Sequence, residues 1–282
     1  MSEGALDPRE HPFRESVAAS YLKGRVEAKR FVDGDMFKVA VGVLPMHGGA
    51  DHTSGRTSEL LFGERFMIYE TMGDWVWGQS QVDGYVGFAR SNGMVPDEGD
   101  PSHEITALRI HAYEKPDLKS TPVALLHMTS RVTVTDEADG YFRTDSGGWV
   151  PRRHLAPIGE GESDIVATAR RYLHTPYLWG GRSSLGLDCS ALIQFALMRS
   201  GRSAPRDSDQ QEHSVGAKIE AGLDGACVGD LLYLKGHVVI MSAPDMVLHG
   251  NAHHMAVAEE PLDGFLERMR GIGLTVTTVR RP

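Results

Sequence analysis

The chain has 282 residues, of which 41% are hydrophobic and 24% charged, and its formal net charge is −9. This is enough apolar material for two or three small domains with cores of their own, so neither a metal nor a disulfide framework is needed for stability. The acidic balance and the lack of a long basic run argue against nucleic acid and anionic membranes as partners.

Two cysteines, Cys189 and Cys227, are too few for a secreted disulfide scaffold. The N-terminus is polar and acidic, without the apolar segment of a signal peptide, and no run approaches the roughly 18 apolar residues that span a membrane. We therefore expect a soluble cytoplasmic protein. A leader removed beforehand would leave no trace in this sequence.

The chain is expected to start with a helical segment at residues 1–24, because an amphipathic stretch runs from Phe13 to Leu22. Residues 25–43 alternate apolar and polar side chains, which predicts strand. The polar, glycine-rich stretch 46–58 predicts a loop long enough to suggest a function.

Two stretches, 63–90 and 129–155, share one pattern of an alternating strand, an acidic turn with glycine, a second strand and a tight turn before an aromatic residue. Short strands and frequent turns favour small β-barrels. Both stretches resemble bacterial SH3 (SH3b) domains, and the resemblance implies two SH3-like barrels. We place these at 25–98, with an inserted loop at 44–58, and at 104–157, joined by the acidic linker 95–104 with its two prolines.

The composition changes after residue 158. Ser163 or Asp164 is expected to cap a helix over IVATARRYLH, and a second, buried helix is expected to begin at Cys189 and to stop at Gly201. Short apolar runs then predict three strands, at 231–234, 237–241 and 246–250. Helices followed by antiparallel strands predict an α+β domain.

Cys189 stands at the start of the second predicted helix. The positive end of a helix lowers the pKa of a thiol, and the first backbone N–H groups are unpaired and ready to hold an oxyanion. If the last two strands are adjacent and antiparallel, their hairpin brings His237 and His249 together, so that one serves as base and the other orients it. The residues therefore predict a nucleophile, a base and an orienting group.

Four segments carry a family resemblance: TPYLWGGRSSLGLDCSALIQ, RDSDQQ, GDLLYLKGHVVIM and MVLHG. In order and spacing they resemble the successive motifs of the NlpC/P60 family across residues 163–282. One departure is Ala191, where glycine is common. The resemblance implies a papain-like domain in which a helix bearing the cysteine packs on an antiparallel sheet bearing the base, with Cys189 as nucleophile, His237 as base and His249 as orienting residue.

The order of domains, SH3b before NlpC/P60, is similar to that of γ-D-glutamyl-L-diamino acid endopeptidases of the dipeptidyl-peptidase VI type. Those enzymes cut the γ-D-glutamyl–diamino acid bond of peptides such as L-Ala-γ-D-Glu-meso-diaminopimelate and require a free N-terminal L-Ala. The resemblance implies that Asp188 meets the substrate ammonium. It implies that the pocket is further lined by Ser190, Tyr177, Trp179, Ser208, Asp207, Tyr85 and Glu64, the last two from the first SH3b domain.

Several of these residues have a plainer structural explanation. Asp188 is alternatively an ordinary helix cap, Ser208 and Asp207 form turns or caps equally well, and Tyr85 is alternatively a barrel-core residue. Cys227, in GACVGD, is expected to be a small buried residue. The 13 histidines include no HExxH motif, and we expect neither a metal site nor a cofactor.

The function predicted is a cysteine peptidase that hydrolyses a small murein peptide in cell-wall recycling, with neither nucleic acid nor membrane as partner. The alternatives are an endopeptidase of intact peptidoglycan, a wall-binding module with an inactive catalytic domain, and an acyltransferase with the same Cys–His chemistry. The residues do not distinguish between diaminopimelate and lysine in the substrate, or between oligomeric states. They also assign no role to the second SH3b domain or to the 46–58 loop.

Overall fold

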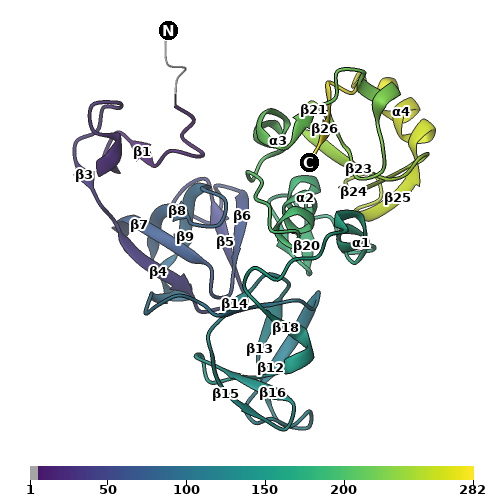
Figure 1. The fold of residues 1–282 in the computed structure, drawn as a ribbon. Helices are drawn as coiled ribbons and strands as arrows, with labels where there is room; N and C mark the ends of the chain where they lie inside the picture. The colour runs from purple at the N-terminus through teal and green to yellow at the C-terminus, as the bar shows by residue number, and fades with distance from the viewer. Residues whose placement is uncertain (1–5) are drawn as a thin grey trace. The chain divides into compact units, whose positions relative to one another are not determined.

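The computed structural model describes residues 6–282, which divide into two compact units, unit 1 ending at Ile158 and unit 2 spanning Gly159–Pro282 (Figure 1). The fold is mixed, rich in strands and poor in helices, as the predicted α+β class requires. Within the described residues, no helix has the length and apolar character needed to cross a membrane.

Residues 6–24 do not form the helix predicted for 1–24, and residues 1–5 of that prediction lie outside the described part of the chain. The N-terminal segment forms β1 (Phe13–Arg14), β2 (Val17–Ala19), a 3-10 turn η1 (Ser20–Leu22) and β3 (Phe31–Val32), with β2 paired to both other strands. All three residues of β2 are buried, and this strand packs with Tyr69 and Trp77 of the adjoining sheet. A helix with one apolar stripe cannot bury three consecutive residues in this way, so packing overrides the amphipathic pattern.

The largest sheet of unit 1 has seven strands in the order β10-β4-β7-β8-β9-β5-β6, with antiparallel neighbours. Inward-facing side chains of these strands, such as Phe66 and Val76, form one core together with Tyr85, which directly precedes β9. The strands are β4 (Asp35–Val39), β5 (Val43–His47), β6 (Arg56–Leu61), β7 (Arg65–Met72), β8 (Trp75–Ser80), β9 (Val86–Arg90) and, after the 3-10 turn η2 (Ser91–Gly93), β10 (Met94–Pro96).

The predicted loop at 46–58 is mostly a β-hairpin. β5 ends at His47 and β6 begins at Arg56, so only residues 48–55 connect the two paired strands. Met46 and Leu60 are buried in the core of the sheet, which holds both ends of the segment in strand conformation. The loop prediction is wrong because local composition does not reveal a pairing partner.

The second group of strands in unit 1 forms a five-stranded sheet, β13-β12-β17-β16-β15, and a three-stranded sheet, β14-β11-β18. Within residues 6–282, neither the five-stranded nor the seven-stranded sheet pairs its outer strands, so closure into two barrels stays a prediction. The strands are β11 (His103–Ile105), β12 (Arg109–Tyr113), β13 (Pro122–His127), β14 (Arg131–Val132), β15 (Val134–Ala138), β16 (Tyr141–Thr144), β17 (Trp149–Pro151) and, after the 3-10 turn η3 (Arg152–His154), β18 (Leu155–Pro157).

One residue that follows the first group of strands in unit 1 packs in the core of the second group. Phe62 follows β6, yet its side chain packs with Ile105 and Leu126 of the second group, and its carbonyl accepts a 2.9 Å hydrogen bond from Arg131 N. Gly63 has a φ of 75°, and a Cβ there would lie 1.8 Å from the Arg131 carbonyl oxygen. Only glycine permits so close an approach.

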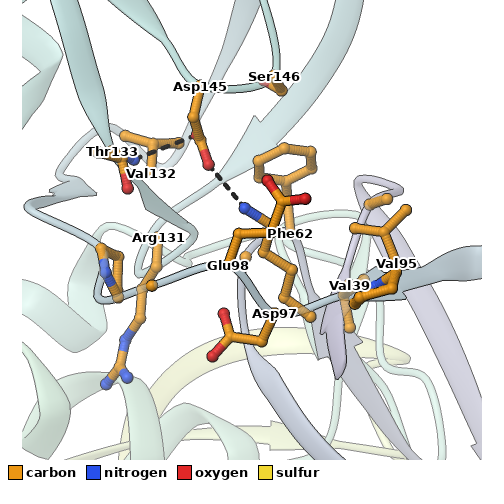
Figure 2. A pocket seen from close by; sticks show the side chains of 16 residues that line it. Val39, Phe62, Val95, Asp97, Glu98, Arg131, Val132, Thr133, Asp145 and Ser146 are labelled. Carbon is orange, nitrogen blue, oxygen red and sulfur yellow. Dashed lines mark hydrogen bonds and ion pairs between the residues drawn. The ribbon is translucent and has the colours of Figure 1, made fainter. Parts of the chain in front are cut away.

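A pocket of about 460 Å³ lies along the same junction (Figure 2). Lys38 and Asp145, which both line it, form an ion pair at 2.7 Å. Of its acidic residues, Asp97 is paired with Arg65 at 2.7 Å. Two of its carboxylates are therefore already paired with cations, and we assign it a structural role.

Unit 2 carries helices on an antiparallel sheet of six strands in the order β21-β26-β22-β23-β24-β25. Its helices are α1 (Ile165–Arg170), α2 (Cys189–Met198), α3 (Ser208–Ser214) and α4 (Leu262–Gly271). Its strands are β19 (Arg182–Ser183), β20 (Gly186–Leu187), β21 (Ala217–Lys218), β22 (Leu231–Leu234), β23 (His237–Ala243), β24 (Met246–Asn251), β25 (Ala256–Pro261) and β26 (Thr278–Arg281), with a 3-10 turn η4 (Gly222–Gly225) before β22. The three strands predicted from apolar runs and the helix beginning at Cys189 are confirmed.

Burial in unit 2 fixes the ends of the elements that carry the predicted site. Side chains of β22, β23 and β24 pack with Phe265 and Met269 of α4. Helix α2 contacts β23 and β24, and every residue from Cys189 to Leu197 is buried. The N-terminus of α2 and the start of β23 are therefore held between packed elements, on a rigid scaffold.

Candidate active site

Cys189 is the first residue of α2, and its thiol is 7% exposed. The backbone N–H groups of Val238 and Ser190 donate to the thiol and favour its ionised form. Burial, helped by the nearby carboxylate of Asp188, outweighs them and raises the pKa of Cys189 to about 12. The resting site therefore holds a neutral thiol beside the first residues of β23.

His237 and His249 form a hydrogen-bonded pair. They lie on the antiparallel strands β23 and β24, and 2.7 Å separates His237 Nε2 from His249 Nδ1. Burial, with help from His249 and Arg268, lowers the pKa of His237 to about 3, and burial likewise lowers the pKa of His249. Both rings are therefore neutral at neutral pH, as a base that must accept a proton requires.

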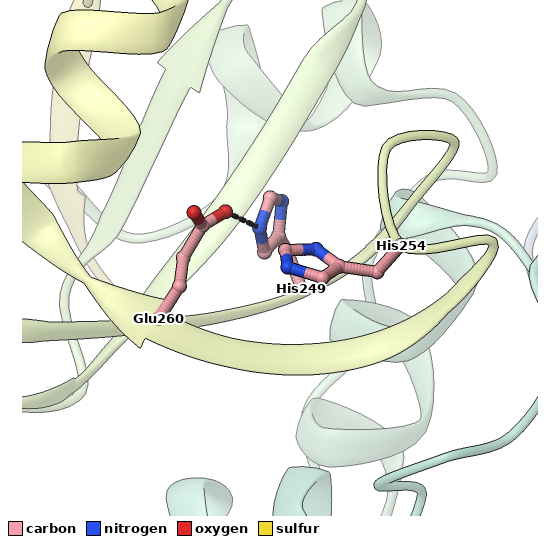
Figure 3. Close-up of side chains that lie close together, drawn as sticks. All are labelled: His249, His254 and Glu260. Carbon is pink, nitrogen blue, oxygen red and sulfur yellow. Dashed lines mark hydrogen bonds and ion pairs between the residues drawn. The ribbon is translucent and has the colours of Figure 1, made fainter.

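The hydrogen bonds of the two histidines extend to two further residues, Glu260 and Arg268, that the sequence analysis does not predict to be in the site. Glu260 Oε1 lies 2.8 Å from His249 Nε2, and Arg268 of α4 pairs with the same carboxylate (Figure 3 shows Glu260 and His249). Burial raises the pKa of Glu260, but hydrogen bonds from His249 and Arg268 outweigh it and lower the value to about 2. A charged carboxylate thus terminates the row of histidines.

Ligand-type atoms of His249, His254 and Glu260 lie within 4.8 Å of one another (Figure 3). Three such groups have the composition of a zinc site. Arg268, however, already places a positive charge on the Glu260 carboxylate, and His254 Nδ1 lies 3.0 Å from Asn251 Oδ1. Hydrogen bonding accounts for the arrangement, and we assign no metal to it.

Asp188 caps α2, the alternative role considered for it. Its carboxylate accepts hydrogen bonds from Ala191 N and Gly180 N at 3.0 and 3.1 Å and from Ser190 Oγ at 3.1 Å. Arg206, only 1% exposed, adds a bidentate ion pair with N–O distances of 3.0 and 2.6 Å. These five bonds fill the acceptor capacity of a carboxylate, so a substrate ammonium would have to share Asp188 with Arg206.

Other predicted residues near the cysteine differ in exposure. Ser190 is 5% exposed and sits between Asp188 and Arg206, from which its Oγ receives a 2.9 Å hydrogen bond. Tyr177 is half-buried, and burial together with Cys189 and Asp188 raises its pKa to about 12. Trp179 is 71% exposed, which leaves its ring accessible to a ligand.

The predicted residues at the start of α3 form a helix cap. Asp207 accepts from the backbone N–H of Gln210, whose side chain accepts from Asp207 N at 3.2 Å, and Ser208 is the first residue of the helix. This capping box is the alternative that the sequence left open for Asp207. Ser208 stays a predicted pocket residue.

Tyr85 and Glu64 belong to unit 1. Tyr85 is 6% exposed and lies in the core of the seven-stranded sheet, as the alternative for this residue requires. Glu64 is fully buried, and one of its oxygens accepts a 2.9 Å hydrogen bond from Leu61 N. Their substrate contacts stay predictions.

Cys227 is exposed, so the prediction that it is a buried residue is wrong. It lies in the turn before β22, where its N–H donates to Asp230 Oδ2 at 2.8 Å. A turn fastened by a carboxylate leaves the side chain facing outward, and the flanking glycines of GACVGD are the local signal for such a turn.

A buried thiol at a helix N-terminus, beside two hydrogen-bonded histidines on an antiparallel sheet, is the arrangement of a cysteine peptidase. The chain is a hydrolase of this class. Residues 174–272 match the NlpC/P60 family, and residues 46–93 match the bacterial dipeptidyl-peptidase Sh3 domain. The chain therefore contains an NlpC/P60 domain preceded by an SH3 domain.

The chain is similar to several known proteins. Dipeptidyl-peptidase 6 of Lysinibacillus sphaericus is 26% identical over 230 residues, which cover 73% of this chain and 83% of that protein. The γ-D-glutamyl-L-lysine dipeptidyl-peptidase of Bacillus subtilis is 26% identical over 192 residues, which are 62% of this chain and 63% of that protein. The crystal structure of an NlpC/P60 family protein from Bacillus cereus aligns with a TM-score of 0.75 at 18% identity, covering 88% of this chain and 99% of the other. This last likeness concerns the fold.

Proposed function

We propose that this protein hydrolyses the γ-D-glutamyl–diamino acid bond of small murein-derived peptides that carry a free N-terminal L-Ala. The observation that carries the proposal is Cys189 at the N-terminus of α2 together with the 2.7 Å contact between His237 and His249. The names of the relatives, dipeptidyl-peptidase 6 and γ-D-glutamyl-L-lysine dipeptidyl-peptidase, support the choice of bond.

In the proposed first step, Cys189 attacks the γ-glutamyl carbonyl while its proton moves to His237 Nδ1, the ring nitrogen that does not face His249. The carbonyl oxygen becomes an oxyanion beside the N-terminus of α2, where the positive end of the helix favours negative charge. The positive charge that develops on the protonated His237 is stabilised by its hydrogen bond to His249 and, through His249, by the Glu260 carboxylate.

In the second step, the tetrahedral intermediate collapses, the bond to the diamino acid breaks, and His237 gives its proton to the departing amine. A thioester links Cys189 to the γ-carbonyl of L-Ala-D-Glu. Water, deprotonated by His237, then attacks the thioester and releases L-Ala-D-Glu and the thiol. No cofactor takes part in this scheme.

The residues proposed for substrate binding differ in burial and in their hydrogen-bond partners. Ser190 and Tyr177 lie beside Asp188 and Cys189, and the exposed ring of Trp179 offers an apolar surface for the peptide. We propose that Asp188 binds the substrate ammonium while it remains paired with Arg206. The ammonium then competes with Arg206 for a carboxylate that is already held in position. Contacts from Ser208, Tyr85 and Glu64 belong to the same proposal.

The proposed molecular organisation is two SH3-like barrels, at 25–98 and 104–157, before a papain-like catalytic domain at 163–282. The match to one Sh3 domain and the strand-rich unit 1 support the first part, and the order of α2 and the sheet supports the second. A role in recycling inside the cytoplasm goes with the short peptide substrate and belongs to the proposal.

The testing experiment is mass spectrometry of L-Ala-γ-D-Glu-meso-diaminopimelate incubated with the protein, beside the same peptide acetylated at its N-terminus. We expect the free peptide alone to be cleaved, with release of L-Ala-D-Glu. A lysine-containing peptide run in parallel measures the preference for the diamino acid.

Other outcomes identify the alternatives. Cleavage of both peptides, together with release of fragments from purified sacculi, would favour an endopeptidase of intact peptidoglycan. Cleavage of neither peptide would overturn the proposal and favour a wall-binding module, which binding to sacculi without hydrolysis would then establish.

A further inference from the structure

Glu260 lies on β25 where that strand passes His249. In the register of the two strands, His249 is opposite Ala258 and Val247 is opposite Glu260, so the side chains of His249 and Glu260 share one face of the sheet. The Glu260 carboxylate points at the His249 ring, 2.8 Å from Nε2 (Figure 3). His249 itself is 1% exposed, so water cannot readily replace this partner.

The charge of this carboxylate determines where the hydrogen atoms of the two rings lie. An ionised carboxylate accepts hydrogen bonds and cannot donate, so His249 Nε2 carries the hydrogen in their contact. A neutral imidazole has one N–H, which leaves His249 Nδ1 as an acceptor. The hydrogen in the 2.7 Å contact between the rings then comes from His237 Nε2, and His237 Nδ1 is left without one.

We infer that Glu260 is a positioning residue that fixes the tautomer of His249 and, through it, the tautomer of His237. The inference rests on the proposed function, because the tautomer matters only if His237 accepts a proton from Cys189. Arg268 holds Glu260 in place by pairing with the same oxygen.

The opposite direction of hydrogen bonding would disable the base. If His249 Nδ1 donated to His237 Nε2, the single hydrogen of His237 would lie on Nδ1, where it would meet the thiol. A ring with N–H at that position cannot take the thiol proton. Without Glu260, no charged hydrogen-bond partner of His249 favours one direction of the hydrogen bond between the two rings over the other. A fraction of the molecules would then adopt the unproductive direction.

The test compares Glu260→Ala with Glu259→Ala. Glu259 is the adjacent residue of β25, so its side chain points to the other face of the sheet, where it pairs with Arg170 at 2.7 Å. Both variants remove one carboxylate and one ion pair with arginine, but Glu259→Ala leaves His249 untouched. The readouts are the ¹⁵N NMR shifts of the histidine rings, which report protonation at each nitrogen, and kcat and KM for the free peptide.

We expect the wild type and Glu259→Ala to show a protonated Nε2 and an unprotonated Nδ1 in both rings. Glu260→Ala should show a mixture of tautomers, with kcat reduced about 10- to 100-fold and KM within about twofold. A third variant, Arg268→Met, keeps the carboxylate and should retain the wild-type tautomers.

Two results would overturn the inference: an unprotonated Nε2 of His249 in the wild type, or equal loss of kcat in Glu260→Ala and Glu259→Ala with unchanged ring tautomers. The NMR readout needs no substrate. If the tautomers behave as expected but no peptide is cleaved by the wild type, the proposed function fails while the effect of Glu260 on the rings stands.

Discussion

In the proposed mechanism Cys189 starts as a neutral thiol, because burial raises its pKa to about 12, and burial lowers the pKa of His237 to about 3. We therefore propose that proton transfer to His237 and attack on the carbonyl occur together, when the substrate is present. This separates the site from one that keeps a thiolate–imidazolium pair at rest. It also means that slow labelling of Cys189 by a thiol reagent at neutral pH would not indicate an inactive domain.

Replacement of Cys189 by alanine should remove the nucleophile and leave the fold intact. We expect kcat/KM for the free peptide to fall at least about 10³-fold, since no other group replaces the thiol. The free energy of unfolding should change by only about 1 kcal/mol, because a single buried sulfur is lost. Peptide assays and urea denaturation check the two parts, and retained hydrolysis would exclude Cys189 as the nucleophile.

The pH dependence follows from the lowered pKa of His237. A base with a pKa of about 3 stays unprotonated at every pH above that value, so acidification to pH 5 does not remove it. We expect kcat/KM at pH 5 to lie within about twofold of its value at pH 7, with circular dichroism confirming the fold at both. A tenfold loss with a midpoint near 6.5, the ordinary pKa of histidine, would contradict this assignment.

The residues proposed to react can be picked out from the sequence more readily than the partners that contact them. Cys189, His237 and His249 stand in short motifs beside predicted element ends, where spacing alone places them close together. Arg206 pairs with Asp188 across 18 residues, and Glu260 reaches His249 across 11, through the packing of a helix and the register of two strands. Neither position carries a local signal for these contacts, so both were missed.

At the scale of elements, α1 and α2 begin with the same kind of cap in different surroundings. Asp164 is exposed and accepts from Ala167 N at 2.9 Å, whereas Asp188 is 8% exposed and also pairs with the buried Arg206. The cap of α1 is therefore a local interaction, while the cap of α2 is part of a buried charge pair.

The two caps should differ sharply when they are replaced by alanine. Asp164→Ala should cost about 1 kcal/mol of unfolding free energy, the usual value of an N-cap. Asp188→Ala should cost about 3–5 kcal/mol, because the buried Arg206 guanidinium loses its ion pair with this carboxylate. Urea denaturation of both variants measures the difference, and equal costs would mean that the Arg206 pair adds nothing to stability.

The sequence predicts correctly those elements that consist of continuous apolar runs. It does not predict elements whose conformation depends on packing against residues far away in the chain. The strand at 231–234 and the helix from Cys189 are buried on most sides, so their sequences signal burial directly. Residues 13–22 have an amphipathic pattern, but packing against Tyr69 and Trp77 stabilises strands there instead of a helix. The pairing of β5 with β6 likewise depends on packing outside residues 46–58, the segment for which the sequence predicts a loop.

At the scale of the whole molecule, unit 1 should unfold as one body although two domains were predicted in it. Phe62, 8% exposed, directly follows β6 of the first group of strands and packs in the core of the second group. We expect Phe62→Ala to cost about 3–5 kcal/mol and to lower protection from hydrogen exchange in both groups together. Leu118→Ala, at a site that is 71% exposed, is the matched control and should change neither. Loss of protection in residues 103–157 alone would show that the groups are independent.

The insertion of Phe62 into the second core also determines how the protein responds to a cut backbone. The segment between β10 and β11 is fastened by ion pairs from Arg65 to Asp97 and Asp100, but it holds no core residue. After a protease cleaves there, the fragments would still be joined by Phe62 and by the close contact of Gly63 with Arg131. The cleaved protein should migrate as a single species on a native gel and separate into two fragments only in denaturant. An intact backbone between β10 and β11 is then needed to assemble unit 1 but not to maintain it.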